Sequence, residues 1–456
     1  MAAWNDHSLL AAYQTAFGTP NITDSDFVAL HCERPEVKFE HELTELDLLT
    51  GQVGAAPERL VGRRSGSIRF AFPVEGLVSG YTGSEDPGDA APAGEEVIPP
   101  WFCLIANALG SNMSVVSSNT NFWRGLGSSV SQYTENGVTA ADTTTSVVKL
   151  DDSTPSNRVD VGQLIVTALS ATDTAPQVGW VKTKATATPS TITLFEASVN
   201  AVADNDAHVY GTTTAYASSE ITETAPITFR WVGANVVQCY DLEDSFCESF
   251  KISWESGAVP VCEFSYKFFN YQRNKLDGEL EVPAAYNRIP QLIGSNNARA
   301  TIDGSNRCGL ENCEFSWAAG SLRVTKCHGS TNGISAVEVL APRVRMAFSV
   351  LDGGTGDDVY DSAGSTASLG QYEWFSRLEL AESISVGVYV GSQVGKILSM
   401  LIPNGRIVAT PDVQFRDSSV AYGLQIEAAA YTADSTDTAE TSADSPINSL
   451  GRVALG

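Results

Sequence analysis

Three cysteines and a histidine are the one group in this sequence whose residue types match a metal centre: Cys308, Cys313, Cys327 and His328. Structural zinc sites usually take two cysteines from a close pair with two residues between them, but four residues separate Cys308 from Cys313. If the later stretch is a strand, Cys327 and His328 point to opposite faces of its sheet. The spacing therefore favours buried core thiols, with zinc as the alternative, and we predict no metal ligands.

Catalytic signatures begin in two places and fail in both. His41 and Glu42 start like a zinc-protease helix, but Glu45 stands where the second histidine is required, so we interpret the stretch as a charged strand edge. Residues 391–396 read G-S-Q-V-G-K, one residue short of a phosphate loop, and Ile397 replaces the serine or threonine that binds magnesium. That segment favours a β-turn. The sequence therefore predicts no catalytic residue, no cofactor-binding residue and no enzyme.

Charge disfavours several classes of partner. The chain has 54 acidic and 28 basic residues, a net charge of −26, which repels the phosphates of nucleic acids and of anionic lipids. The densest basic run contains Arg59, Arg63, Arg64 and Arg69. We expect these arginines to pair with acidic neighbours within or between subunits. The acidic pairs 151–152 and 357–358 are expected in solvated turns.

The sequence also indicates where the chain folds. No stretch is apolar enough to span a bilayer, which predicts no membrane partner. The first residues lack the basic and then apolar run of a secretory signal. We therefore expect folding in a reducing cytoplasm, where most of the eight cysteines should be buried thiols.

Period-two alternation of apolar residues dominates the sequence and predicts an all-β fold, either a sandwich or a barrel, with one or two short helices. The predicted strands include residues 68–74, 250–254, 262–268, 344–350, 384–390 and 420–426, with a hairpin turn at Ser256-Gly257. One helix is predicted from Trp101 to Leu109, after two prolines and before Gly110. A second is predicted from Ser8 to Phe17, because Leu9, Leu10, Tyr13 and Phe17 have helical spacing.

Composition divides the chain into three parts. Residues 143–218 are rich in Thr, Val and Ala and carry short strand patterns at 161–166, 180–183 and 191–195. We interpret them as a small inserted β-module between core parts 1–142 and 219–456; an extension of the same sheet is the alternative. Segments 84–96, 352–368 and 433–445 are rich in Gly, Ser, Thr and Asp, which favours exposed acidic loops.

Four stretches occur in a characteristic order. The first is an opening short helix that contains aromatic residues and ends in Phe17-Gly18-Thr19-Pro20, and the second is residues 59–70, RLVGRRSGSIRF, leading into a long core strand. The third is residues 99–110, PPWFCLIANALG, and the fourth is the hairpin FKISWESGAVPVCEF at 250–264. Together they resemble the tail tube, or major tail, proteins of long-tailed bacteriophages.

The resemblance implies a tail-tube fold, in which a β-sandwich or barrel with a flanking helix carries the inserted module on the tube exterior. Subunits of that family form hexameric rings that stack into a hollow tube. The genomic DNA leaves the virion through its acidic lumen without specific binding. The implied partners are further copies of the chain and other tail proteins: the tail terminator, the tape measure and the distal tail protein. The implied location is the virion tail, after synthesis in the host cytoplasm.

Two other functions remain open. The chain could be a different self-assembling virion component, such as a tail terminator or head decoration protein. It could also be a carbohydrate-binding adhesive β-module, for which aromatic side chains such as Trp180 and Tyr210 would form an exposed platform for sugar. Rings or tubes at high concentration would favour the tube, whereas stable monomers that bind a glycan column would favour the adhesive module.

Overall fold

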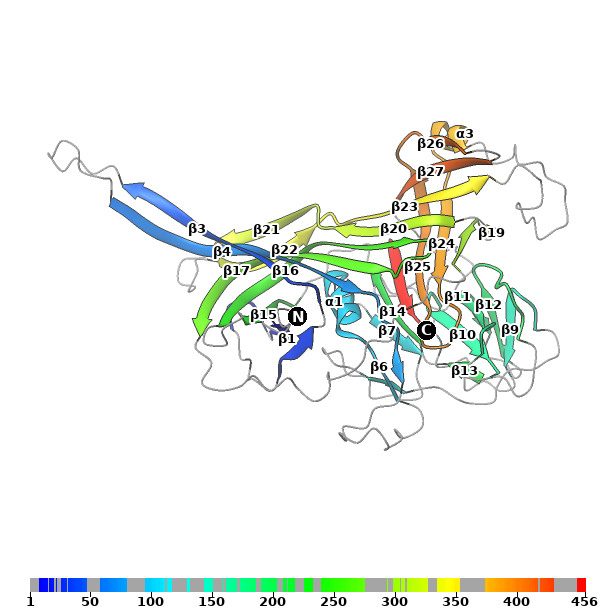
Figure 1. The fold of residues 1–456 in the computed structure, drawn as a ribbon, viewed down its shortest axis with the longest axis horizontal. Coiled ribbons are helices and arrows are strands. Elements are labelled where there is room, and N and C mark those ends of the chain that lie inside the picture. Colours follow the sequence, from blue (N-terminus) through cyan, green and yellow to red (C-terminus); the bar gives the residue numbers. More distant parts are fainter. Residues whose placement is uncertain are drawn as a thin grey trace.

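The chain folds predominantly into antiparallel β-sheet (Figure 1). The computed structural model describes residues 8–14, 16–19, 22, 26–30, 32–46, 58–79, 95–110, 113–116, 129–131, 143–150, 159, 161–169, 173–185, 190–202, 208–210, 212–217, 225–232, 239–274, 293, 298–303, 305–307, 310–326, 334–352, 374–416, 419–429 and 449–456. Within these residues the prediction of an all-β fold with one or two short helices is confirmed, whereas its sandwich or barrel form stays a prediction.

The described strands form one large sheet and three smaller ones. The large sheet contains β1 (Ser8–Tyr13), β2 (Val28–Leu30), β3 (Glu36–Leu46), β4 (Glu58–Pro73), β7 (Met113–Val116), β14 (Thr212–Ala217), β15 (Ile227–Val232), β16 (Cys239–Glu255), β17 (Val261–Asn274), β18 (Arg299–Ile302), β19 (Ser305–Arg307), β20 (Leu310–Ala318), β23 (Arg343–Asp352), β24 (Ile384–Val390), β25 (Leu398–Ile407), β26 (Asp412–Arg416), β27 (Ser419–Ala428) and β28 (Gly451–Leu455). The smaller sheets contain β9 (Val147–Leu150), β10 (Leu164–Ala168), β11 (Gln177–Ala185), β12 (Ser190–Leu194) and β13 (His208–Tyr210); β5 (Val78–Ser79), β6 (Glu95–Val97) and β8 (Ser129–Ser131); and β21 (Ser321–Lys326) and β22 (Ile334–Leu340).

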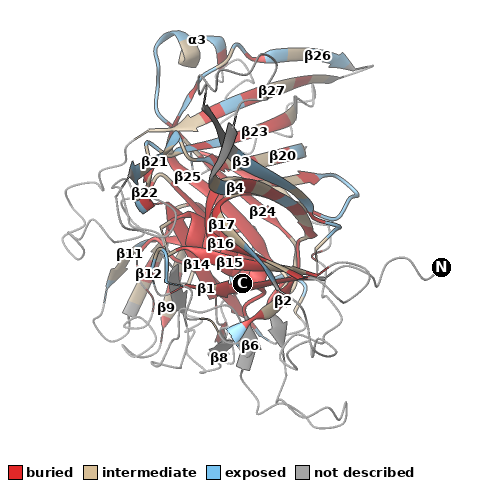
Figure 2. Ribbon diagram, turned by 90° about the vertical axis from the view of Figure 1, so that its left-hand side faces the viewer, coloured by how far each residue is buried: buried red, intermediate tan, exposed pale blue. Residues whose placement is uncertain are grey.

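One row of strands in the large sheet is long and continuous. Its order is β3-β4-β17-β16-β20-β23-β27-β26, with every neighbour antiparallel. We call this row the wall. Strand β27 also pairs with β25, and β25 in turn pairs with β24 and β28. The core lies between the wall and these last strands, and it is the red interior of Figure 2.

The alternating sequence explains which face of the wall is buried. In β4, Ile68, Phe70 and Phe72 are at most 5% exposed, whereas Arg69 between them is exposed. The hairpin from β16 to β17 turns at Gly257, whose φ of +85° lies in the left-handed region that glycine adopts without strain. The predicted strands and hairpin turn are confirmed because each core-facing position pairs with another in the next strand.

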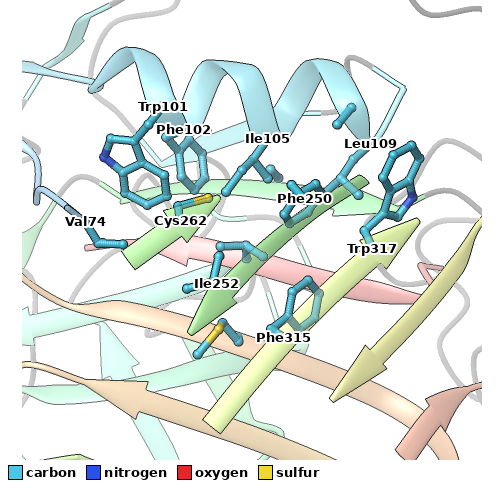
Figure 3. Packing of buried hydrophobic residues seen from close by; sticks show 14 of the residues in the cluster. Val74, Trp101, Phe102, Ile105, Leu109, Phe250, Ile252, Cys262, Phe315 and Trp317 are labelled. Carbon is cyan, nitrogen blue, oxygen red and sulfur yellow. The ribbon is translucent and has the colours of Figure 1, made fainter. Parts of the chain in front are cut away.

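Helix α1 (Pro100–Ala108) confirms the helix predicted for this stretch, and it lies inside the core. All of its residues are buried, as expected of a helix that is apolar nearly all round, and its one polar side chain, Asn107, donates to the carbonyl of Ala225 at 2.9 Å. Figure 3 shows Trp101, Phe102 and Ile105 above the side chains of β16, β17 and β20. The described residues contain one other helix, α3 (Trp374–Glu379), which the sequence did not predict.

The predicted helix from Ser8 to Phe17 is wrong. Residues 8–13 form β1, which pairs with β15 on one side and with β2 on the other. Leu9, Leu10, Ala11 and Ala12 are each at most 2% exposed, so both faces of the strand are buried. A short run that is apolar on both faces has the same pattern in a buried strand as in a buried helix. Periodicity could not separate the two.

Strands β9 to β13, between residues 147 and 210, form a five-stranded sheet of their own (Figure 1). Its core contains residues from that stretch alone, among them Val148, Ile165 and Ile192. Strand β14 lies within the predicted range 143–218 but pairs with β28 and β7 of the large sheet. The three-part division of the chain stays a prediction, and β14 belongs structurally with the core.

Candidate assembly surface

Of the metal-like group, only Cys313 lies among the described residues. It lies on β20 in the main core and is 1% exposed, and burial raises the pKa of its thiol. Cys308, Cys327 and His328 lie outside the described residues, so the zinc alternative stays open for them. Where the chain is described, no three His, Cys, Asp or Glu side chains are grouped so that they could hold a metal ion.

The other described cysteines bear out the prediction of buried thiols. All are thiols outside any disulfide; Cys103, Cys239, Cys247 and Cys262 are buried, and Cys32 is half-buried. Burial raises the pKa of Cys32 to about 12 and also raises the pKa values of Cys247 and Cys262 well above the ordinary value for a thiol. These thiols are therefore protonated and poor nucleophiles at neutral pH.

The two incomplete catalytic signatures form ordinary strand and turn structure. His41 is an exposed residue of β3, and its Nε2 lies 3.1 Å from the hydroxyl oxygen of Tyr271. Residues 391–396 form the tight connection from β24 to β25, in which the amide of Lys396 donates to the carbonyl of Gln393 at 2.9 Å. The expected strand edge and β-turn are confirmed.

The basic run lies on β4, and the register of β3 places acidic residues opposite two of its members. Arg69 lies opposite Glu36, and Arg59 lies opposite Glu45. The guanidinium of Arg64 lies 5.7 Å from the centre of the Tyr271 ring. Pairing of these arginines with acids of another subunit stays a prediction. The acidic pairs 151–152 and 357–358 and the loops predicted at 352–368 and 433–445 lie largely outside the described residues.

The outward face of the wall is polar along much of its described length, but Phe246 and Phe269 on this face are buried against Ile334 and Val337 of β22. Elsewhere its side chains are charged, small or hydroxyl-bearing: Ser67, Arg69, Lys251, Ser253, Glu255, Glu263, Ser265, Lys267, Glu314, Ser316, Arg345, Ala347, Ser349 and Glu427. Opposite charges alternate across neighbouring strands. The ammonium of Lys251 lies 3.5 Å from Glu263 and 3.8 Å from Glu314, and Arg345 lies 2.7 Å from Glu427. A face of this kind offers no basic stripe to nucleic acid.

Both ends of the wall are unfinished. Among the described residues, β3 pairs only with β4, and β26 pairs only with β27. On the core-facing side of these terminal strands Phe39 is 38% exposed and Phe415 is 84% exposed. The sheet thus extends beyond its own core at each end. Unpaired strand edges beside exposed rings favour pairing with another chain.

The first end of the wall also projects from the body as a two-stranded arm (Figure 1). The pairing of β4 with β17 ends at Gly66, whereas its pairing with β3 continues to Glu58 opposite Leu46. Residues 40–46 and 58–65 therefore pair only with each other among the described residues. An isolated two-stranded ribbon is only marginally stable in water, so contacts with another molecule would stabilise the arm.

A buried acidic cluster on β16 holds the segment that follows β1. Asp244 has a φ of +55°, its amide donates to Gln14 at 3.1 Å, and its carboxylate accepts from the amide of Gly18 at 2.8 Å. Asn270 donates to Glu243 at 2.5 Å. Burial and the neighbouring Asp244 raise the pKa of Glu243 to about 7. Nothing in the sequence pattern indicated that these acids are buried.

The aromatic platform considered for a sugar-binding module is not exposed. Trp180 is 0% exposed and Tyr210 is 3% exposed, and both pack where the five-stranded sheet meets β24 and β25. That prediction is wrong because alternation within a strand does not show whether its second face is covered by another sheet.

Comparison with known proteins assigns neither a family nor a function to the chain. No family model matches the chain, and no curated protein matches it in sequence. No helix in the described part of the chain is long and apolar enough to cross a bilayer. The wall, with its two open ends and its arm, is therefore the structural feature on which a functional proposal can be based.

Proposed function

We propose that this chain is a structural subunit of a phage tail tube, in which copies join edge to edge into hexameric rings and the rings stack into a hollow conduit for DNA. The observation that carries the proposal is the wall, a continuous sheet. At each end of its described part, the last strand has an unpaired outer edge and carries an exposed aromatic ring. The ring size, the phage context and the tail-protein partners come from the sequence resemblance alone.

The two ends of the wall are suited to a head-to-tail contact. Strand β3 at one end and β26 at the other present different residues, so a contact between them joins unlike surfaces. Unlike surfaces build a closed ring when the rotation between neighbours closes, and open filaments when it does not. Joining the strands also pairs their free backbone groups and lets each copy cover Phe39 or Phe415 of the next.

The polar face of the wall is the surface that we assign to the conduit. Its opposite charges alternate at Lys251, Glu263 and Glu314 and again at Arg345 and Glu427. DNA would find no basic stripe on such a face to which its phosphates could bind tightly. The net charge of −26 adds long-range repulsion of phosphate. An acidic lumen thus stays part of the proposal.

The arm is suited to contact between rings because it projects beyond the body of the subunit. Its two strands pair with no third strand among the described residues. Contact with a neighbouring ring would supply the packing that a lone ribbon lacks.

Negative-stain electron microscopy of concentrated protein tests the proposal directly. We expect rings with a central hole and stacks of such rings. A matched variant in which residues 42–63 are replaced by an Asn-Gly turn keeps the pairing of His41 with Arg64 and should fold and form rings without stacking, since Asn-Gly closes two-residue hairpins. Monomers at every concentration would contradict the proposal, and so would solid filaments without a lumen.

A further inference from the structure

The five-stranded sheet is fixed to the large sheet along a mixed seam. Val178, Trp180 and Tyr210 pack against Tyr389 and Ile397 in one buried cluster. A pocket of about 350 Å³ opens beside this seam, with walls from both sheets. Its volume is within the range of small-molecule sites, roughly 300–1,000 Å³.

The lining of the pocket is unusual for so acidic a chain. An apolar floor is formed by Pro176, Val178, Ala298 and Ile397, and the polar side chains around it belong to Thr174, Ser198, Asn200, Arg299, Tyr389 and Ser392. Among the described residues no acidic side chain lines it, although the chain contains 54 acidic residues. The nearby Asp173 accepts from the amides of Leu169 and Ala175 at 3.3 Å and 2.9 Å.

The one charged lining residue is held in place on three sides. Arg299 donates to the carbonyl oxygens of Ala197 at 3.1 Å and Val178 at 2.8 Å. Its guanidinium lies 4.1 Å from the centre of the Tyr389 ring. A cation whose position is fixed before binding loses little side-chain entropy when a ligand arrives.

A buried carboxyl group holds the ring of Tyr389 in its place beside Arg299. The hydroxyl of Tyr389 donates to Glu196 at 2.8 Å, and Glu196 is 1% exposed. Burial raises the pKa of Glu196, whereas its hydrogen bonds with Thr301 and Tyr389 and the nearby Arg299 lower it.

We propose that this pocket binds a compact organic acid that carries one carboxylate and several hydroxyl groups, with a uronic acid as the model ligand. The carboxylate would lie near Arg299, the hydroxyl groups near Ser198, Asn200 and Ser392, and the carbon skeleton on the apolar floor. A phosphate monoester fits less well, because it carries about two negative charges and Arg299 is the only basic residue in the described part of the lining. The site does not involve the ends of the wall, so it is independent of assembly.

Calorimetric titration of the full chain with glucuronate, glucose and glucose 6-phosphate tests the site. We expect glucuronate to bind at about millimolar Kd and the other two at least about tenfold more weakly. Arg299→Gln should weaken glucuronate binding by about tenfold or more. Ser392→Phe should abolish binding by filling the pocket, whereas Ser256→Phe, in the exposed β16–β17 turn, should not change it. Thermal unfolding shows whether each variant is folded.

Three results would overturn the proposal: no glucuronate binding by the folded wild-type chain, equal binding of glucose or glucose 6-phosphate, or unchanged binding in folded Ser392→Phe. Because rings and tubes are scored separately by electron microscopy, failure of this site leaves the tube proposal untouched.

Discussion

The exposed ring at the free end of the wall gives the sharpest test of assembly. Phe415 on β26 is 84% exposed in the single chain. Full burial of a phenylalanine side chain contributes about 1.5–3 kcal/mol, and about 1.4 kcal/mol corresponds to a tenfold change in an equilibrium constant. If a neighbouring copy covers the ring, Phe415→Ser should weaken each contact between copies by about tenfold to a hundredfold. The stability of the single chain should change by less than about 0.5 kcal/mol, because the substitution is on its surface.

Sedimentation velocity over a range of concentrations measures the assembly, and urea unfolding measures the stability of the chain. Val199→Ser is the matched control, because Val199 is 61% exposed but lies after β12, away from the wall. The reasoning is refuted if Phe415→Ser assembles at the same concentration as the wild type, or if Val199→Ser weakens assembly equally. A large loss of chain stability in Phe415→Ser would show that the ring packs within its own subunit.

Three further predictions concern the interior. A methyl group on Gly387 would lie 2.7 Å from both carboxylate oxygens of Glu196, so Gly387→Ala should lower the free energy of unfolding by about 1–3 kcal/mol in urea, and by less in a Glu196→Ala background. The folded pKa of Glu243, about 7, lies above the ordinary value of 4.5 for glutamate, so its stabilising contribution is full below about pH 4.5 and is lost as the pH rises to about 7. Glu243→Gln should flatten this decline in thermal unfolding between about pH 5 and about pH 7. Phe102→Ala in α1 should lower the free energy of unfolding by about 3–5 kcal/mol, since Phe102 is 0% exposed.

The parts of the fold that alternate strictly could be predicted from the sequence. Ile68, Phe70 and Phe72 identified β4, and Phe250, Ile252 and Trp254 identified β16, because a wall with one polar face imposes period two on both strands. Helix α1 was predictable for another reason. Its two prolines and its terminal glycine are local signals that do not depend on the rest of the fold.

Elements covered on both faces could not be predicted in the same way. Residues 9–12 of β1 are apolar at every position, and β15, β2 and the core enclose them. Trp180 and Tyr210 looked available for ligands because their own strands do not show that β24 and β25 cover them. In both cases the deciding contact comes from a distant part of the chain, and periodicity carries only local information.

The pocket could not be predicted from the sequence either. Its lining joins residues 174–200 of one sheet to Arg299, Tyr389 and Ser392 of another, and none of these residues belongs to a recognisable motif. The incomplete catalytic and metal-site signatures at His41, Cys313 and residues 391–396 lie instead in a strand, the core and a turn. The surfaces on which both proposals rest therefore form only when the sheets come together, and such surfaces are defined by pairing register and coverage. An arginine that is one of 28 basic residues in the sequence becomes a distinctive group only when two backbone carbonyls and an aromatic ring fix it in a cavity whose described lining contains no acid.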